Sequence, residues 1–136
     1  IKEKFAQKYY SKIGLGIDFT ARDIQEECKS KGLPWEKAKG FDGSAQISRK
    51  FIDKTKLKLD NISFQLEKNG EIVQSGNSSY MIFNFDKIIS YLSKFYSLKI
   101  GDLIYTGTPS GVGEVIAGDI LKGFITNKEM LNVIVK

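Results

Sequence analysis

The clearest alternation of apolar and polar residues lies in ISFQLEKNGEIVQSG, residues 62–76. This period of two is typical of a strand with one buried face. Within it, Asn69–Gly70 is the dipeptide favoured in a two-residue type I′ turn, so a return strand is expected. The two leucines just before this segment fall in the opposite phase, which predicts a bulge or break near Asp60–Asn61.

A spacing of three and four residues replaces the alternation in NFDKIISYLSKFYSLKIGD, residues 84–102. It predicts an amphipathic helix, with Asn84 as its N-cap. The apolar face of this helix is formed by Phe85, Ile88, Ile89, Leu92, Phe95 and Tyr96.

A strand followed by a second helix is expected nearer the N-terminus. YYSKIGLGID, residues 9–18, combines β-branched and aromatic residues with two glycines that permit close backbone approach. Thr20 is the predicted N-cap of the helix, with Asp23 in capping-box register. The helix is expected to end near Gly32. Its buried stripe consists of Ala21, Ile24 and Cys28.

The remaining segments complete the predicted fold. Residues 2–9 resemble the end of a helix, with Phe5, Ala6 and Tyr9 on one side, and residues 35–53 are an ordered loop with short extended pieces. Strands are expected in LIYTGTP, EVIAGDILKGFIT and MLNVIVK, with turns at the two Gly-Asp pairs. Residues 1–136 are thus predicted to be one β-rich α+β domain with two or three short helices.

Composition narrows the possible chemistry. The chain has no histidine and one cysteine, Cys28, which excludes a structural zinc site and Ser-His or Cys-His nucleophiles within the chain. Any metal would need oxygen ligands, as Mg²⁺, Mn²⁺ and Ca²⁺ do. The lone thiol favours a reducing, cytoplasmic location. No apolar run approaches the roughly 18 residues of a membrane span.

The net charge of +5 raises the possibility of a nucleic-acid partner. However, the 21 lysines and arginines are spread evenly among 16 acidic residues, so a solvated surface without nucleic acid is the favoured interpretation.

Asp18 is the first candidate for chemistry, because it follows a predicted strand and precedes a predicted helix. Its carboxylate has two interpretations: a group that caps backbone N–H groups, or part of a site. Arg22 and Gln25 share one face of the helix. They are either solvated surface groups or donors to an anionic substrate at the helix N-terminus.

Two further segments carry candidate residues. Lys37 and Lys39 alternate with apolar residues, so one lysine could face an apolar pocket and stabilise an enolate or oxyanion; the alternative is another solvated lysine. TGTPSGVG, residues 106–113, lacks the lysine of a phosphate-binding loop. Its Thr106, Thr108 and free backbone N–H groups are still suited to bind a carboxylate.

Four segments in the same order resemble the fumarylacetoacetate hydrolase family. They are GIDFTARDIQ, KGLPWEKAKGFD, NGEIVQSGNSSYMIF and LKIGDLIYTGTPSGVG. The similarity covers nearly the whole chain and is greatest to small acylpyruvase and oxaloacetate-decarboxylase-type members. It implies a mixed β-roll, a homodimer, and a Mg²⁺ or Mn²⁺ ion held by three carboxylates.

The resemblance also implies roles for particular residues. In such enzymes the metal binds the two oxygens of a 2-oxo or β-diketo acid and stabilises the enolate left when a C–C bond breaks. By position, Asp18 matches the third metal carboxylate, and Lys39 matches a catalytic lysine that balances enolate charge. Arg22 and Gln25 match residues that face the substrate, and Thr108 matches the threonine that binds its carboxylate or oxo end.

The sequence departs from the family pattern in two respects. The other two metal ligands of the family form a Glu-x-Glu pair, and its catalytic Glu–His pair includes a histidine; both precede the segment matching Ile1, and neither is present here. Residues 1–136 are therefore expected to be the C-terminal portion of the catalytic domain. Besides C–C bond cleavage by a hydrolase or decarboxylase, two alternatives stay open. One is an inactive family remnant or binding module, and the other is an isomerase or hydratase of oxo-dienoic acids.

Overall fold

Three antiparallel sheets organise the chain in the computed structural model, which describes residues 1–136. The largest is a four-stranded sheet of order β6-β5-β7-β8. Its strands are β5 (Ser63–Lys68), β6 (Glu71–Asn77), β7 (Ile120–Ile125) and β8 (Lys128–Ile134). The two short ladders pair β1 (Lys12–Ile13) with β4 (Ile52–Asp53), and β2 (Gly16–Asp18) with β3 (Ala45–Ile47).

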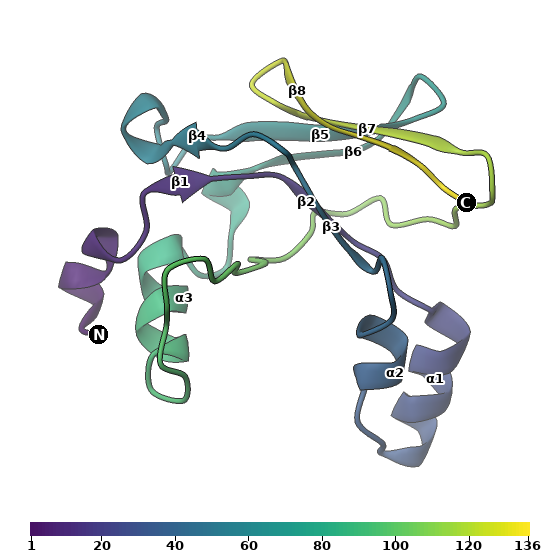
Figure 1. Cartoon of the computed structure of the whole chain (residues 1–136), viewed down its shortest axis with the longest axis horizontal. Helices are drawn as coiled ribbons and strands as arrows, with labels where there is room; N and C mark the ends of the chain where they lie inside the picture. The colour runs from purple at the N-terminus through teal and green to yellow at the C-terminus, as the bar shows by residue number, and fades with distance from the viewer.

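The helices are short and gather in two groups on one side of the sheet (Figure 1). One group comprises α1 (Arg22–Lys31) and α2 (Glu36–Lys39), and the other comprises α3 (Phe85–Leu92) and the 3₁₀ helix η1 (Glu3–Lys8). Two more 3₁₀ turns are η2 (Lys54–Lys56) and η3 (Ser78–Tyr80). The predicted β-rich α+β fold with few short helices is confirmed. None of the helices combines the length and the apolar character that a membrane crossing requires.

The hairpin predicted from the alternation is confirmed. Asn69 and Gly70 both have positive φ angles, 54° and 89°, as a type I′ turn demands. The break predicted near Asp60–Asn61 is a turn, closed by the Asn61 N–H donating to the Lys58 carbonyl. A shift of register occurs as well, between Leu66 and Glu67.

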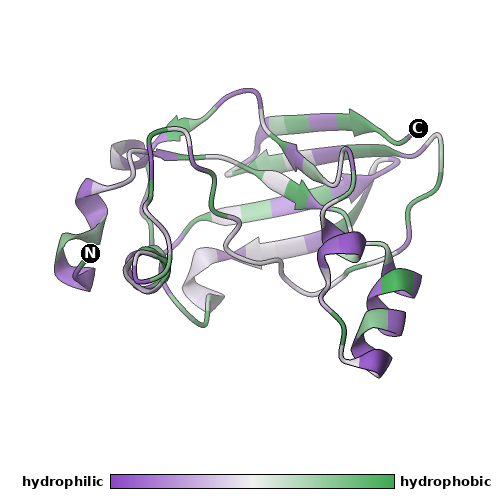
Figure 2. Ribbon diagram, turned by 60° about the horizontal axis from the view of Figure 1, so that its bottom comes forward, coloured by the Kyte–Doolittle hydropathy of each residue, from purple (hydrophilic) through white to green (hydrophobic).

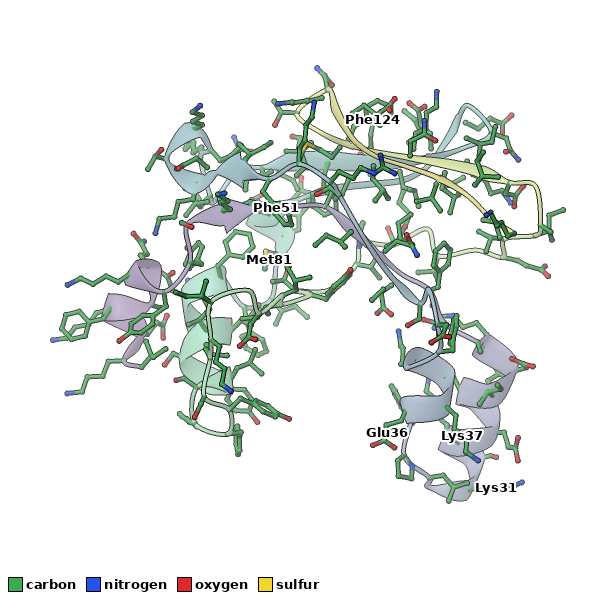
Figure 3. The ribbon with its side chains drawn as sticks, in the orientation of Figure 1. Lys31, Glu36, Lys37, Phe51, Met81 and Phe124 are labelled. Atoms are coloured by element: carbon green, nitrogen blue, oxygen red, sulfur yellow. The ribbon has the colours of Figure 1, made fainter.

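The core lies between the sheet and the β1–β4 ladder. Ile62, Ile125 and Met130 form its buried centre. In Figure 3, Phe51 and Met81 lie below the sheet, whereas Phe124 lies above it. Figure 2 shows the matching alternation of apolar and polar residues along the strands. Partly buried apolar residues surround the centre: Ile13, Leu15, Ile52, Leu57, Leu59, Phe64 and Phe85.

The chain leaves an unusually large part of its surface open. Its accessible area is 9938 Å², whereas a compact monomer of 15.3 kDa exposes about 7,100 Å². Only 15 of the 136 residues are buried. Large apolar side chains such as Tyr80, Ile82 and Ile100 are therefore exposed, and patches of this kind mark surfaces of interaction or ligand binding.

The helix predicted over residues 84–102 is confirmed at its start and wrong at its end. The Asn84 side chain accepts a hydrogen bond from the Lys87 N–H at 2.8 Å, as an N-cap does. However, α3 ends at Leu92, where the Ser93 hydroxyl donates to the Ser90 carbonyl and accepts from the N-terminal amino group. The aromatic rings of Phe95 and Tyr96 are consequently about two-thirds exposed, at 64% and 66%.

Four other local predictions differ from the structure. The strand expected over residues 9–18 is interrupted between β1 and β2, where the Leu15 N–H donates to the Ser48 hydroxyl instead of a ladder partner. The loop expected over 35–53 contains the one-turn helix α2, and residues 103–109 form no strand. Near the N-terminus only Ala6 is buried, because Phe5 and Tyr9 point to solvent.

Asp119 ties the turn before β7 to the hairpin. Its carboxylate accepts hydrogen bonds from the Ile116 N–H at 2.9 Å and the Asn69 side-chain amide at 2.8 Å. These bonds, the Ile116 bond first, hold the pKa of Asp119 below its ordinary value of 3.8. Since the folded-state pKa is lowered, this contribution to stability is complete above that ordinary value and is lost as the pH falls through the lowered pKa.

We therefore expect Asp119→Asn to lower the urea midpoint at pH 7 and to flatten the loss of stability below about pH 4. Urea unfolding followed by circular dichroism between pH 7 and pH 2.5 measures both effects. The matched control is Asp42→Asn, since Asp42 is exposed. If the urea midpoint of Asp119→Asn falls below pH 4 as steeply as that of the natural protein, another carboxylate causes the loss of stability in acid.

Candidate active site

An open cleft of about 2030 Å³ runs beneath the sheet, bounded by β2, the start of α1 and the long segment before β7. Asp18, Arg22, Lys39 and Thr108 all line it. The structure thus brings four of the five predicted site residues to one cleft. The fifth, Gln25, is 4% exposed and does not line it.

Lys39 connects the strand that carries Asp18 to the helix α2. Its Nζ donates to Asp18 Oδ2 at 2.8 Å and to Thr20 Oγ1 at 2.7 Å. The two charged side chains are 34% and 48% exposed, so their attraction is screened by water and adds at most about 1 kcal/mol to stability. The pair places a positive charge beside a carboxylate on the cleft wall.

The start of α1 differs from the predicted capping box. The N-cap is Ala21, and no side chain caps the helix. Thr20 lies one residue before this N-cap, and its hydroxyl accepts from Lys39 Nζ rather than from the first turn of the helix. The helix does end at Gly32, whose φ of 63° is left-handed as predicted for a C-cap. An uncapped helix N-terminus leaves backbone N–H groups free beside the cleft, a feature that favours anions.

Arg22 and Gln25 form a pair on the first turn of α1. Arg22 Nη1 donates to Gln25 Oε1 at 2.9 Å. Of the predicted stripe, Cys28 is buried, whereas Gln25 rather than Ile24 is the other buried residue of the helix. The buried amide therefore orients the guanidinium, and the substrate contact predicted for Gln25 stays a prediction.

Thr108 lies in a segment that side chains, rather than a ladder, hold in place. The Gln74 side-chain amide on β6 donates to Thr108 Oγ1 at 3.0 Å and to the Pro109 carbonyl at 3.0 Å. Because the Thr108 oxygen accepts this bond, its own O–H is free to donate to a ligand. We call residues 106–113 the threonine loop.

Sequence reasoning missed Gln74 and Tyr105, which line the cleft and bond to or precede the threonine loop. Gln74 lies in a segment with a clear strand pattern, where a polar residue is expected by alternation alone. The Tyr105 hydroxyl donates to the Gln46 carbonyl at 2.7 Å. Gly16 of the GLG segment was a signal for Tyr105, because the ring packs against it.

The donor set for a metal ion is incomplete in these residues. No group of three or more His, Cys, Asp or Glu side chains comes together in the chain. At the centre of the cleft wall, Asp18 supplies one carboxylate, which Lys39 already pairs. Residues 1–136 thus supply one carboxylate suited to coordinate a divalent ion, and they do not form a complete metal site by themselves.

Comparison with known proteins identifies the relationship. Residues 2–133 match the model described as fumarylacetoacetate (FAA) hydrolase C-terminal. The chain belongs to the fumarylacetoacetate hydrolase family. Its similarity to this family is therefore not confined to the four segments that first indicated it, and includes the sheet that supports the cleft.

Several members of the fumarylacetoacetate hydrolase family are close relatives. The mitochondrial oxaloacetate tautomerase FAHD1 of Bos taurus is 45% identical over 126 residues, 92% of this chain and 57% of the relative. The mitochondrial oxaloacetate decarboxylase of Dictyostelium discoideum is 45% identical over 90% of this chain and 56% of its own length. This chain thus spans little more than half the length of these relatives.

A solved structure of the same family has the same fold. The fumarylpyruvate hydrolase of Pseudomonas aeruginosa, in complex with Mn²⁺ and pyruvate, superposes with a TM-score of 0.91 at 34% identity. The match covers 99% of this chain and 58% of that one. Relatives of this chain are thus enzymes named for reactions of small oxo acids.

The threonine loop gives a direct test of the cleft geometry. Gly111 has a φ of +96°, and a Cβ there would collide with the Val73 carbonyl of β6. Gly113 has no neighbour within 4 Å of such a Cβ and no left-handed φ. Since a left-handed residue with a side chain costs about 1–2 kcal/mol before any collision, Gly111→Ala is expected to destabilise the protein by at least that much.

The measurement is the urea midpoint of Gly111→Ala beside that of Gly113→Ala, which we expect to be nearly neutral. Equal midpoints for the two variants would contradict the described path of the loop along β6.

Proposed function

We propose that the protein containing this chain catalyses an enolate-forming reaction on a small 2-oxo acid, with oxaloacetate or an acylpyruvate as substrate. Cleavage of a C–C bond by hydrolysis or decarboxylation was the sequence prediction, and keto–enol tautomerisation proceeds through the same enolate. The observation that carries this proposal is the Lys39 ammonium, held by Asp18 and Thr20 on the wall of the cleft.

The chemistry follows from where negative charge develops. Loss of a proton, or loss of a carboxylate group as CO₂, at the carbon next to the oxo group leaves an electron pair that moves to the oxo oxygen. A fixed ammonium group beside that oxygen stabilises the enolate more than the neutral ketone, which is the condition for catalysis. Lys39 is suited to this role because it is already oriented by two acceptors.

The carboxylate of an oxo acid has suitable partners in the same cleft. Arg22 supplies a guanidinium that Gln25 orients, and the free N–H groups at the start of α1 add a partial positive charge. The Thr108 hydroxyl can donate a further bond, because Gln74 occupies its acceptor side. These groups bind and orient the acid, and charge that develops on it faces Lys39.

The proposal includes a divalent cation, for which Asp18 is the one ligand that this chain supplies. The Pseudomonas relative holds Mn²⁺ and pyruvate, and we assign to Asp18 the role of one ligand to a Mg²⁺ or Mn²⁺ ion. Such an ion polarises a bound oxo group as a Lewis acid. The predicted homodimer and cytoplasmic location stay predictions; the bovine and Dictyostelium relatives are mitochondrial by name.

The first prediction of this proposal concerns binding. In the protein at its natural length, Asp18→Ala is expected to abolish the joint binding of Mn²⁺ and oxalate, an analogue of the enolate, because it removes a charged ligand. Isothermal titration calorimetry measures this. Unchanged heats in the variant would remove Asp18 from the site, whereas no binding by the natural protein would count against the proposed metal dependence.

The second prediction concerns catalysis. Lys39→Met is expected to lower kcat on oxaloacetate by about 100-fold or more, the usual effect of removing one group that stabilises an oxyanion, while the unfolding midpoint changes little. The matched control is Lys37→Met, since Lys37 lies with Lys31 and Glu36 at the lower end of the α1–α2 pair, away from the sheet (Figure 3).

Assays of enol formation, CO₂ release and acylpyruvate hydrolysis on the same preparation distinguish the three reactions. Equal activities of Lys39→Met and Lys37→Met would show that Lys39 does not stabilise the enolate. Absence of all three activities in the natural protein would favour the alternative of an inactive family member.

A further inference from the structure

Tyr105 connects the threonine loop to the ladder that carries Asp18. It immediately precedes the loop in sequence, and its hydroxyl donates to the Gln46 carbonyl on β3 at 2.7 Å. Gln46 pairs with Ile17, the neighbour of Asp18 on β2. One side-chain hydrogen bond thus links the residue before Thr106 to the strand pair that carries Asp18, the partner of Lys39.

The ring of Tyr105 takes the place of a missing side chain on β2. A Cβ at Gly16 would lie 2.6 Å from Tyr105 Cε1 and 2.9 Å from Cζ, so Gly16 leaves the room that the ring fills. Side chains two residues apart in a strand point to the same face. The ring therefore lies on the face of β2 that carries Asp18, and it is the next group along the cleft wall.

The phenol keeps its proton at neutral pH. Partial burial of the side chain, and then the negative charge of Asp18, raise the pKa of Tyr105 above its ordinary value of 10.0. The hydroxyl is consequently a donor throughout the physiological range, as the bond to the Gln46 carbonyl requires. The ring is 42% exposed and lines the same cleft as Lys39 and Thr108.

The threonine loop has no ladder bonds of its own and is held at two positions. Gln74 holds Thr108 and Pro109 against β6, and Tyr105 holds the beginning of the loop against β3. The first tie fixes the loop to the sheet, and the second fixes its beginning to β3, the strand that pairs with β2 and Asp18. The loop is therefore tied both to the sheet and to the strand pair that carries Asp18.

We propose that Tyr105 is a positioning and specificity-determining residue: its hydroxyl holds the threonine loop at a set distance from Asp18, and its ring limits the length of oxo acid that fits between them. This inference rests on the proposed function. A rigid aromatic wall beside the charged centre favours short acids such as oxaloacetate over longer acylpyruvates.

Two substitutions separate the hydroxyl from the ring. Tyr105→Phe keeps the wall and loses the bond to Gln46, so the KM for oxaloacetate is expected to rise about three- to tenfold, the effect of one neutral hydrogen bond, with kcat nearly unchanged. Tyr105→Leu also shortens the wall. The ratio of kcat/KM for a longer acylpyruvate to that for oxaloacetate is expected to rise about tenfold or more, within the range that one or two methylenes produce.

The control variant is Tyr91→Phe, because Tyr91 is 59% exposed and does not line the cleft. We expect its kinetic constants to equal those of the natural protein. A KM in Tyr105→Phe equal to that of Tyr91→Phe would overturn the role of the hydroxyl. An unchanged substrate ratio in a folded Tyr105→Leu would overturn the role of the ring.

Hydrogen–deuterium exchange tests the tie without any turnover. Amides of residues 106–113 are expected to exchange several-fold faster in Tyr105→Phe than in Tyr91→Phe, with the sheet unchanged. Unchanged exchange in the loop would overturn the proposal even if the natural protein turns over oxo acids. If the loop exchanges faster in Tyr105→Phe but the natural protein acts on no oxo acid, the Tyr105 bond is supported and the proposed function is rejected. The two failures are therefore distinguishable.

Discussion

The shared hydrogen bonds of the Lys39 ammonium determine how the candidate site is arranged. Because Lys39 donates to both Asp18 and Thr20, it holds α2 against the end of β2 and orients Thr20 just before α1. The helix begins at Arg22, with Ala21 as its N-cap and no side chain capping its first N–H groups. The ion pair is too exposed to contribute much stability, so its importance is geometric. One cation fixes a carboxylate, a hydroxyl and the start of a helix along a single wall.

The parts of the fold that could be predicted are those in which local sequence decides the backbone. Asn69–Gly70 tolerates positive φ at both positions, and Asn84 caps α3 with its own side chain. Predictions were wrong where a side chain expected to act locally bonds to a group far away in the sequence. The Thr20 hydroxyl is bonded to a lysine 19 residues away, and α3 stops where Ser93 meets the N-terminus. Sequence spacing carries no information on such partners.

The sequence motifs indicated which residues belong to the candidate site, but they said little about how those residues contact one another. The resemblance indicated Asp18, Arg22, Lys39 and Thr108, which line one cleft, but gave no account of Gln74 or Tyr105. In place of the strand expected over residues 103–109, these two side chains hold Tyr105, Thr108 and Pro109 by hydrogen bonds. Gln25 matched the motif and is buried beneath Arg22. A motif thus indicated the residue without distinguishing contact with a ligand from support of its neighbour.

The path of the threonine loop also affects how the protein behaves in solution. β6 is at one edge of the four-stranded sheet, and an uncovered edge strand can pair with another chain. Gly111 lies against the Val73 carbonyl of this strand, and the Gln74 side chain crosses to the loop, so the loop covers part of the edge. Changes that free the loop to accept new ligands would uncover backbone groups that can recruit a second chain. The same loop thus bounds the cleft and covers part of a sheet edge, so its path bears on both the fit of a ligand and the pairing with other chains.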